Sequence, residues 1–170
     1  MLKLTQKQKD FIENKIIEYF NGISDIQNEK IENSENAEEL ILNIRFKNFN
    51  KLKHSEELHF LIKNWNWDDG NEIAFKVLSH PMCDRATALM IYWVNTPDFF
   101  VNFENIDNVP NYLQSNYQLF RTTEKRLLNN EFELQNIKFN PKSIASWEAI
   151  ENDKIPNGLK IESIGFDFIF

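Results

Sequence analysis

Residues 54–95 constrain the fold more than any other part of the chain, because their apolar side chains recur every three or four positions in three short runs. This period is typical of amphipathic helices. Turn signals separate the runs, first Trp67-Asp-Asp-Gly70 and then His80-Pro81, since a residue before proline disfavours helix. The sequence therefore predicts three short helices joined by tight turns, an arrangement of helical hairpins.

The rest of the chain is predicted to extend this array within one domain, residues 1–170, because 170 residues are close to a typical domain of roughly 150. We expect N-terminal helices in residues 1–50, three central helices in 53–95, and further helices and an extended arm in 96–170. The fold class predicted is mostly α, a repeat-like array of helical hairpins with a short extended C-terminal element.

Particular residues define the two ends of this array. Thr5 and Gln8 have the spacing of a capping box and begin the first helix. Its apolar face is expected to carry Ile12, Ile16, Tyr19 and Phe20. Residues 24–40 are interpreted as an acidic solvated loop plus the acidic first turn of a second helix, which follows Ser34. The extended arm is predicted from strict alternation of apolar residues, at Ile164, Phe166, Phe168 and Phe170.

Composition limits the chemistry. The single cysteine, Cys83, excludes an intramolecular disulfide and multi-cysteine metal sites, and four glycines leave no room for a glycine-rich phosphate loop. We expect no cofactor. The net charge of −7 argues against binding nucleic acid or an anionic membrane and suits a basic protein partner. With no long apolar run and no apolar leader, the chain is expected to be cytoplasmic. The sequence leaves its oligomeric state undetermined.

The central segment resembles a known family. Trp67-Asp-Asp-Gly70, then His80-Pro-Met-Cys-Asp84, Thr87-Ala-Leu89 and Tyr92-Trp93 resemble the signature of the bacterial domain of unknown function 4274. One departure is Arg85, where the family pattern leads us to expect leucine or a small residue. The resemblance implies a helical, cytoplasmic bacterial domain that is sometimes encoded near toxin and immunity proteins. It implies no catalytic residues.

Two interpretations of this signature remain open. In the first, it is structural: Asp69 forms a capping pair with Glu72, Asp68 is an alternative cap, Asp84 caps the next helix, and His80 donates to Asp68 or Asp69. The tryptophans would pack between helices. The residues of this structural signature are Trp65, Trp67, Asp68, Asp69, Gly70, His80, Pro81, Asp84 and Trp93. In the second, the turns of residues 68–84 form the centre of a hydrolase or metal-dependent enzyme, using Asp68, Asp69, His80, Cys83 and Asp84.

We favour the first interpretation, because neither metal-ligand spacing nor a nucleophile with its base is recognisable. The function expected is a non-catalytic protein-binding module of the immunity type, which neutralises a bacterial toxin by occlusion. Its expected partner, a basic toxin domain, would meet one of two acidic stretches, residues 25–39 or 98–107. The partner-binding residues predicted are Glu35, Glu38, Glu39, Asp98, Phe99, Phe100, Glu104 and Asp107, with Tyr112 as a further aromatic anchor.

Overall fold

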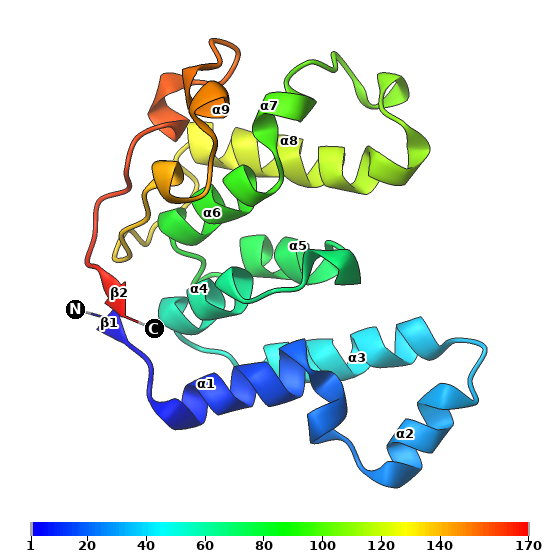
Figure 1. The fold of residues 1–170 in the computed structure, drawn as a ribbon. Helices are drawn as coiled ribbons and strands as arrows, with labels where there is room; N and C mark the ends of the chain where they lie inside the picture. Colours follow the sequence, from blue (N-terminus) through cyan, green and yellow to red (C-terminus); the bar gives the residue numbers. More distant parts are fainter. Residues whose placement is uncertain (1, 170) are drawn as a thin grey trace.

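The computed structural model describes residues 2–169, and helices dominate it, which confirms the mostly-α prediction. The helices stack in layers, from α1, α2 and α3 at one end to α7, α8 and α9 at the other (Figure 1). The longer helices are α1 (Gln6–Ile12), α2 (Asp25–Glu32), α3 (Ala37–Phe49), α4 (Ser55–Lys63), α5 (Glu72–Ser79), α6 (Arg85–Val94) and α8 (Gln114–Leu128). Among residues 2–169, no helix has the length and apolarity needed to cross a bilayer.

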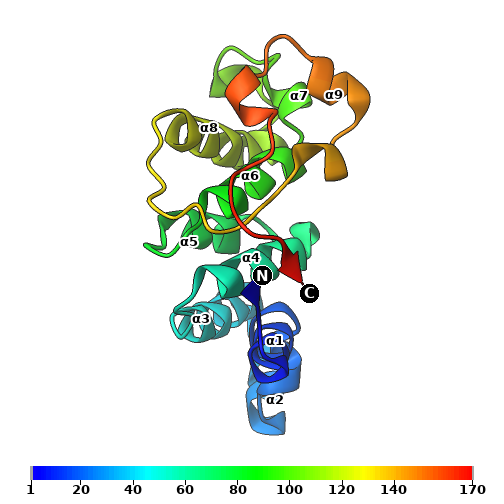
Figure 2. The ribbon, with the colours of Figure 1, turned by 90° about the vertical axis from the view of Figure 1, so that its left-hand side faces the viewer.

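Short elements connect these helices. They are the π-turn η1 (Glu13–Ile17), the 3-10 turns η2 (Tyr19–Gly22), η3 (Trp67–Asp69), η4 (Ile106–Asn108), η5 (Asn111–Leu113), η6 (Pro141–Ser143) and η7 (Asn157–Leu159), and the short helices α7 (Pro97–Phe100) and α9 (Trp147–Glu151). The two ends of the chain meet halfway up the stack, where β1 (Leu2–Lys3) and β2 (Phe168–Ile169) pair in parallel (Figure 2).

The first helix begins as predicted and ends differently. The Thr5 hydroxyl and the Gln8 side chain form a reciprocal capping box, and Ile12 and Ile16 are fully buried. The helix then widens into η1 and leaves helical conformation at Glu18, with φ −95° and ψ 56°. Because the helical period is lost there, Phe20 does not reach the core, and its side chain is 55% exposed.

Residues 24–40 contain a helix that the sequence interpretation missed. Ser24 and Gln27 form a second capping box that begins α2. Only Ile31 of this helix is buried, so the helix lacks the repeated apolar face on which the prediction relied. The following helix, α3, begins at Ala37 after the bend, and Phe49 and Leu52 are buried at its far end.

The centre of the stack is α6, which has eight of its ten residues buried between α4 and α8. Tyr92 of α6 stacks on Phe120 of α8, with ring centroids 5.5 Å apart. This packing places α6, the last helix of the signature segment, in the core of the structure.

The C-terminal arm, residues 160–169, is extended but is held by its backbone. The Phe166 N–H donates to the Asn136 carbonyl at 2.8 Å, and the Lys138 N–H donates to the Phe166 carbonyl at 2.9 Å. Because backbone hydrogen bonds attach the arm, its alternating side chains need not face the core. Ile164 and Phe166 are exposed, Phe168 packs against the core, and Phe170 lies outside the described residues.

Candidate functional site

A groove of about 1040 Å³ lies between the first part of α3, the η1–η2 segment and the turn that carries η3. We call it the acidic groove. Its lining residues are Ile17, Glu18, Tyr19, Phe20, Glu38, Glu39, Ile41, Leu42, Arg45, Asn66, Asp68, Asp69, Gly70 and Glu72. It therefore combines the acidic start of α3 with the Trp-Asp-Asp-Gly part of the signature.

The acidic groove is strongly negative. Six carboxylates line it against the single guanidinium of Arg45, a net charge of −5. Glu18 lies between η1 and η2, and Glu38 and Glu39 lie in the first turn of α3. Asp68 and Asp69 lie in η3, and Glu72 begins α5. Because like charges gathered in a hollow concentrate the negative potential, the groove attracts cations more strongly than the same charges spread over a convex surface.

Arg45 holds the walls of the groove together. It is 7% exposed, and its Nη2 donates to Asp69 Oδ2 at 2.6 Å and to the Ile17 carbonyl at 3.0 Å. Its guanidinium lies 5.1 Å from the ring centre of Tyr19 and 4.9 Å from that of Trp65. One side chain thus joins η1, α3 and the signature turn, and the remaining carboxylates are left to face solvent.

The predicted role of Asp69 is wrong in its detail. Asp69 is not the cap of α5, because Asn71 occupies the N-cap position and Asp69 pairs with Arg45. Asp68 does not cap α5 either, and its own N–H is bound by the Asn66 side chain. The turn needs Gly70, which has φ +89°, where a Cβ atom would meet the Glu72 carboxylate at 2.5 Å.

The second half of the signature lies in the core. The cap predicted at Asp84 is confirmed: its Oδ1 accepts from the Ala86 N–H at 2.8 Å. His80 does not contact Asp68 or Asp69, because its Nδ1 accepts from the Met82 N–H and its ring packs edge-on against Phe49.

Pro81 is exposed in the turn between α5 and α6. Burial raises the pKa of Cys83 to about 12, which keeps this thiol protonated at neutral pH. Within residues 2–169, no group of three or more His, Cys, Asp or Glu side chains is arranged to hold a metal ion.

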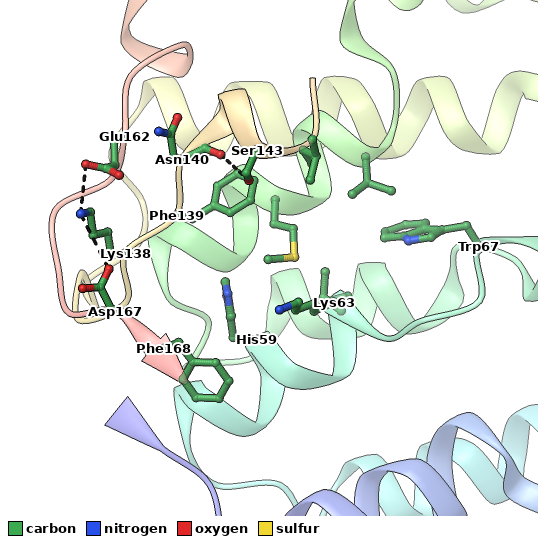
Figure 3. Close-up of a pocket in the computed structure, with 14 residues that line it drawn as sticks. His59, Lys63, Trp67, Lys138, Phe139, Asn140, Ser143, Glu162, Asp167 and Phe168 are labelled. Carbon is green, nitrogen blue, oxygen red and sulfur yellow. Dashed lines mark hydrogen bonds and ion pairs between the residues drawn. The ribbon is translucent and has the colours of Figure 1, made fainter. Parts of the chain in front are cut away.

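The signature aromatics pack between helices, as predicted. The Trp65 indole N–H donates to the Gly70 carbonyl at 3.1 Å, and that of Trp93 donates to the Leu159 carbonyl at 2.7 Å. Trp67 differs from both, because it is half-buried and lines a second, smaller cavity under the C-terminal arm (Figure 3).

The predicted partner-binding residues fall into separate places. Glu38 and Glu39 line the acidic groove, whereas Glu35 is exposed outside it. Residues 98–107 lie at the opposite end of the stack (Figure 1), where Glu104 and Asp107 are exposed and Asp98 is half-buried. Phe99 is 43% exposed, and Tyr112 is exposed as well. Phe100 is wrong as a surface anchor, because it is 2% exposed and stacks on Phe120 in the core.

Sequence reasoning missed Glu18 and Glu72 as members of the acidic groove, and it did not connect Asp68 with Glu38 and Glu39. The one sequence feature that could have indicated this groove is the surplus of acidic residues on both sides of α3. The pairing of α3 with the signature turn depends on Arg45, a single residue whose burial no sequence pattern indicated.

These features define a class of protein, an all-α helical array with an acidic groove between its N-terminal helices and its central hairpins. Residues 53–128 match the model of the family described as a domain of unknown function, DUF4274. The match confirms the resemblance and extends it through α8. No curated protein and no solved structure matches the chain significantly.

Proposed function

We propose that this protein is a non-catalytic, cytoplasmic binding module of the immunity type, which takes a basic segment of a bacterial toxin into the acidic groove and so occludes it. The observation that carries the proposal is the convergence of six carboxylates on one hollow. A toxin that acts on nucleic acid needs cationic side chains to hold phosphates, and carboxylates can pair with those same side chains.

The groove also offers apolar contacts that a specific interface needs. Ile41 and Leu42 lie in its wall, and the Phe20 ring stands partly exposed at its edge. Interface energy concentrates in a few such aromatic anchors, surrounded by polar residues that set orientation and association rate. The groove thus supports binding of a segment that combines Lys or Arg with apolar side chains.

The experiment is charge reversal in the acidic groove, read out with the protein encoded by the gene immediately upstream, tested as the candidate toxin. The variant Glu38→Lys/Glu39→Lys/Asp68→Lys leaves Asp69 on Arg45, so the walls stay joined. We expect slower association, a weaker dependence of the on-rate on salt, and loss of growth rescue.

The matched control reverses the other acidic stretch, as Asp98→Lys/Glu104→Lys/Asp107→Lys. We expect this variant to bind and rescue like the unaltered protein. If the groove variant binds with unchanged rate and salt dependence while its fold is intact, the acidic groove is not the binding surface. If the control variant is the one that fails, residues 98–107 bind the partner instead.

A further inference from the structure

Five large apolar side chains of the C-terminal third of the chain stand in solvent, and we call them the arm patch. They are between 48% and 78% exposed: Ile144, Trp147, Ile161, Ile164 and Phe166. With about 200 Å² for each fully exposed side chain of this size, these fractions leave roughly 600 Å² of apolar surface in water. That area lies at the upper end of the roughly 300–600 Å² that the largest patch on a monomer covers, and patches of this size are often functional.

The arm patch is gathered beside one hollow, the smaller cavity under the C-terminal arm. Figure 2 shows the arm running along this side of the stack, with α9 beside it. Ile144 lines the cavity, and Ile161 and Phe166 directly adjoin Glu162 and Asp167, which line it too (Figure 3). The helix α9 begins three positions after Ile144. The patch is therefore one surface, formed by the arm and by the segment that leads into α9.

The arm directs two of the patch side chains outward. Side chains alternate between the two faces of an extended chain, and Gly165 lies directly against the backbone of residues 136 and 137. Ile164 and Phe166, one position to either side of Gly165, therefore point away from the fold, in agreement with their exposure. Because hydrogen bonds to residues 136 and 138 hold the inner side of the arm, another surface must dock on the arm to bury these two side chains.

The charges around the arm patch favour a second copy of this chain as that surface. Residues 138–167 contain four Lys and five Asp or Glu, a net charge of −1, whereas the acidic groove carries −5. The charged neighbours of the patch members have both signs: Lys142, Lys160, Glu148, Glu162 and Asp167. A two-fold interface sets a patch against the same patch, so it is free of net repulsion only where the charges are mixed. A strongly basic partner gains little here, because the carboxylates are balanced by lysines.

We propose that the arm patch is the interface of a two-fold symmetric homodimer, in which Trp147, Ile164 and Phe166 of each protomer are buried against its partner. The patch members supply roughly 600 Å² of the about 800 Å² that each partner contributes to a standard interface, and their polar neighbours can supply the rest. The acidic groove shares no lining residue with the cavity beside the patch and lies away from the arm (Figure 1). The dimer therefore leaves both acidic grooves open.

Sedimentation equilibrium of the full chain tests this proposal without a ligand. Between about 1 and 300 μM protein, the mean mass should rise from 20.3 kDa toward twice that value and no further. Trp147→Glu/Ile164→Glu places charges in the patch at two exposed positions and should weaken the dimer by about tenfold or more. An unchanged melting temperature at low protein concentration shows that this variant is folded.

The matched control is Tyr112→Glu/Ile26→Glu, which alters one aromatic residue and one isoleucine that are 81% and 68% exposed outside the patch. It should dimerise like the unaltered protein. The proposal is overturned if the chain stays monomeric throughout, if the control weakens the dimer as much as the patch variant does, or if the mass rises beyond two chains. A monomeric chain whose patch variant loses growth rescue would assign the arm patch to the toxin, which also overturns the proposal.

Discussion

The Asp84 carboxylate accepts a hydrogen bond from the backbone N–H of Asn136 at 2.6 Å, which ties the start of α6 to a segment 52 positions further along the chain. The same carboxylate also accepts hydrogen bonds from the N–H groups of Ala86 and Ile137. Asp84 is fully buried. Asp84 is thus more than a helix cap, because it also satisfies backbone donors of the extended strand-like segment that carries the C-terminal arm.

The first prediction follows from this arrangement. Asp84→Ala should lower the free energy of unfolding by about 3 kcal/mol or more, because it removes a cap worth about 1 kcal/mol and leaves buried N–H groups unpaired. Urea denaturation measures the change. Asp68→Ala removes an exposed carboxylate of the same signature and should change stability by less than about 0.5 kcal/mol. A loss at Asp84 no larger than that at Asp68 would contradict the role of the buried carboxylate.

The second prediction concerns the pair formed by Arg45 and Asp69. Arg45→Met should destabilise the fold by about 2–3 kcal/mol, because the guanidinium bonds and its stacking on two aromatic rings are lost. Asp69→Asn should cost about 1 kcal/mol, since the Asp69 side chain remains 31% exposed.

A double-mutant cycle distinguishes pairing from capping. If Asp69 acts through Arg45, Asp69→Asn should have little effect in the Arg45→Met background. If Asp69 acts as a helix cap instead, its effect should persist in that background, and the pairing that the structure shows would not account for it.

The third prediction is a dependence of stability on pH that comes from His59. Burial, together with the nearby Lys63, lowers the pKa of His59 from 6.5 to about 3. The folded protein therefore keeps this imidazole neutral, hydrogen-bonded to Thr87 Oγ1 at 3.0 Å, whereas the unfolded chain takes up a proton below pH 6.5. Stability should fall as pH drops from 6.5 toward 3, by up to about 1.4 kcal/mol per pH unit from this group.

Denaturation at pH 7, 6, 5 and 4.5 tests this dependence. His59→Gln, which cannot titrate, should show a shallower loss of stability between pH 6.5 and 5 than the unaltered protein. Equal slopes in this range would mean that His59 does not carry the effect. Below pH 5, carboxylates also titrate, so the comparison depends on the higher interval.

Much of the fold was predictable because the central hairpins combine three consistent local signals. Apolar residues at helical spacing, the break at His80-Pro81 and the cap at Asp84 all indicate the same boundaries, and the structure follows them. The helix α2 was missed for the opposite reason: it has a capping box but one buried residue, so its apolar face is nearly absent. The capping box of Ser24 and Gln27 correctly indicates where α2 begins, even without an apolar face.

The candidate sites were harder to predict because they depend on contacts between distant segments. Arg45 reaches Asp69 across 24 positions, and this contact brings the acidic residues on α3 to the signature turn. Phe100 was assigned to the surface from its acidic neighbours, but the turn of α7 directs it toward Phe120. Arg85, the departure from the family pattern, donates to the Leu127 carbonyl near the end of α8, a partner that its position in the sequence does not indicate.

The last prediction concerns the attachment of the C-terminal arm at Gly165. This residue has φ +144°, and a Cβ atom there would lie 2.5 Å from the carbonyl carbon of Ile137 and 2.7 Å from that of Asn136. Real Cβ atoms do not approach backbone so closely, so Gly165→Ala must push the arm away from residues 136–138. The hydrogen bonds between Phe166 and both Asn136 and Lys138 should then break.

Hydrogen exchange of the Lys138 and Phe166 amides measures this detachment directly. Both amides should lose protection in Gly165→Ala, and the free energy of unfolding should fall by about 2 kcal/mol from two lost hydrogen bonds and backbone strain. Gly158→Ala is the matched control, because a Cβ atom at Gly158 meets nothing within 4 Å. Retained protection in Gly165→Ala, or equal loss in Gly158→Ala, would show that the close approach at Gly165 does not hold the arm in place.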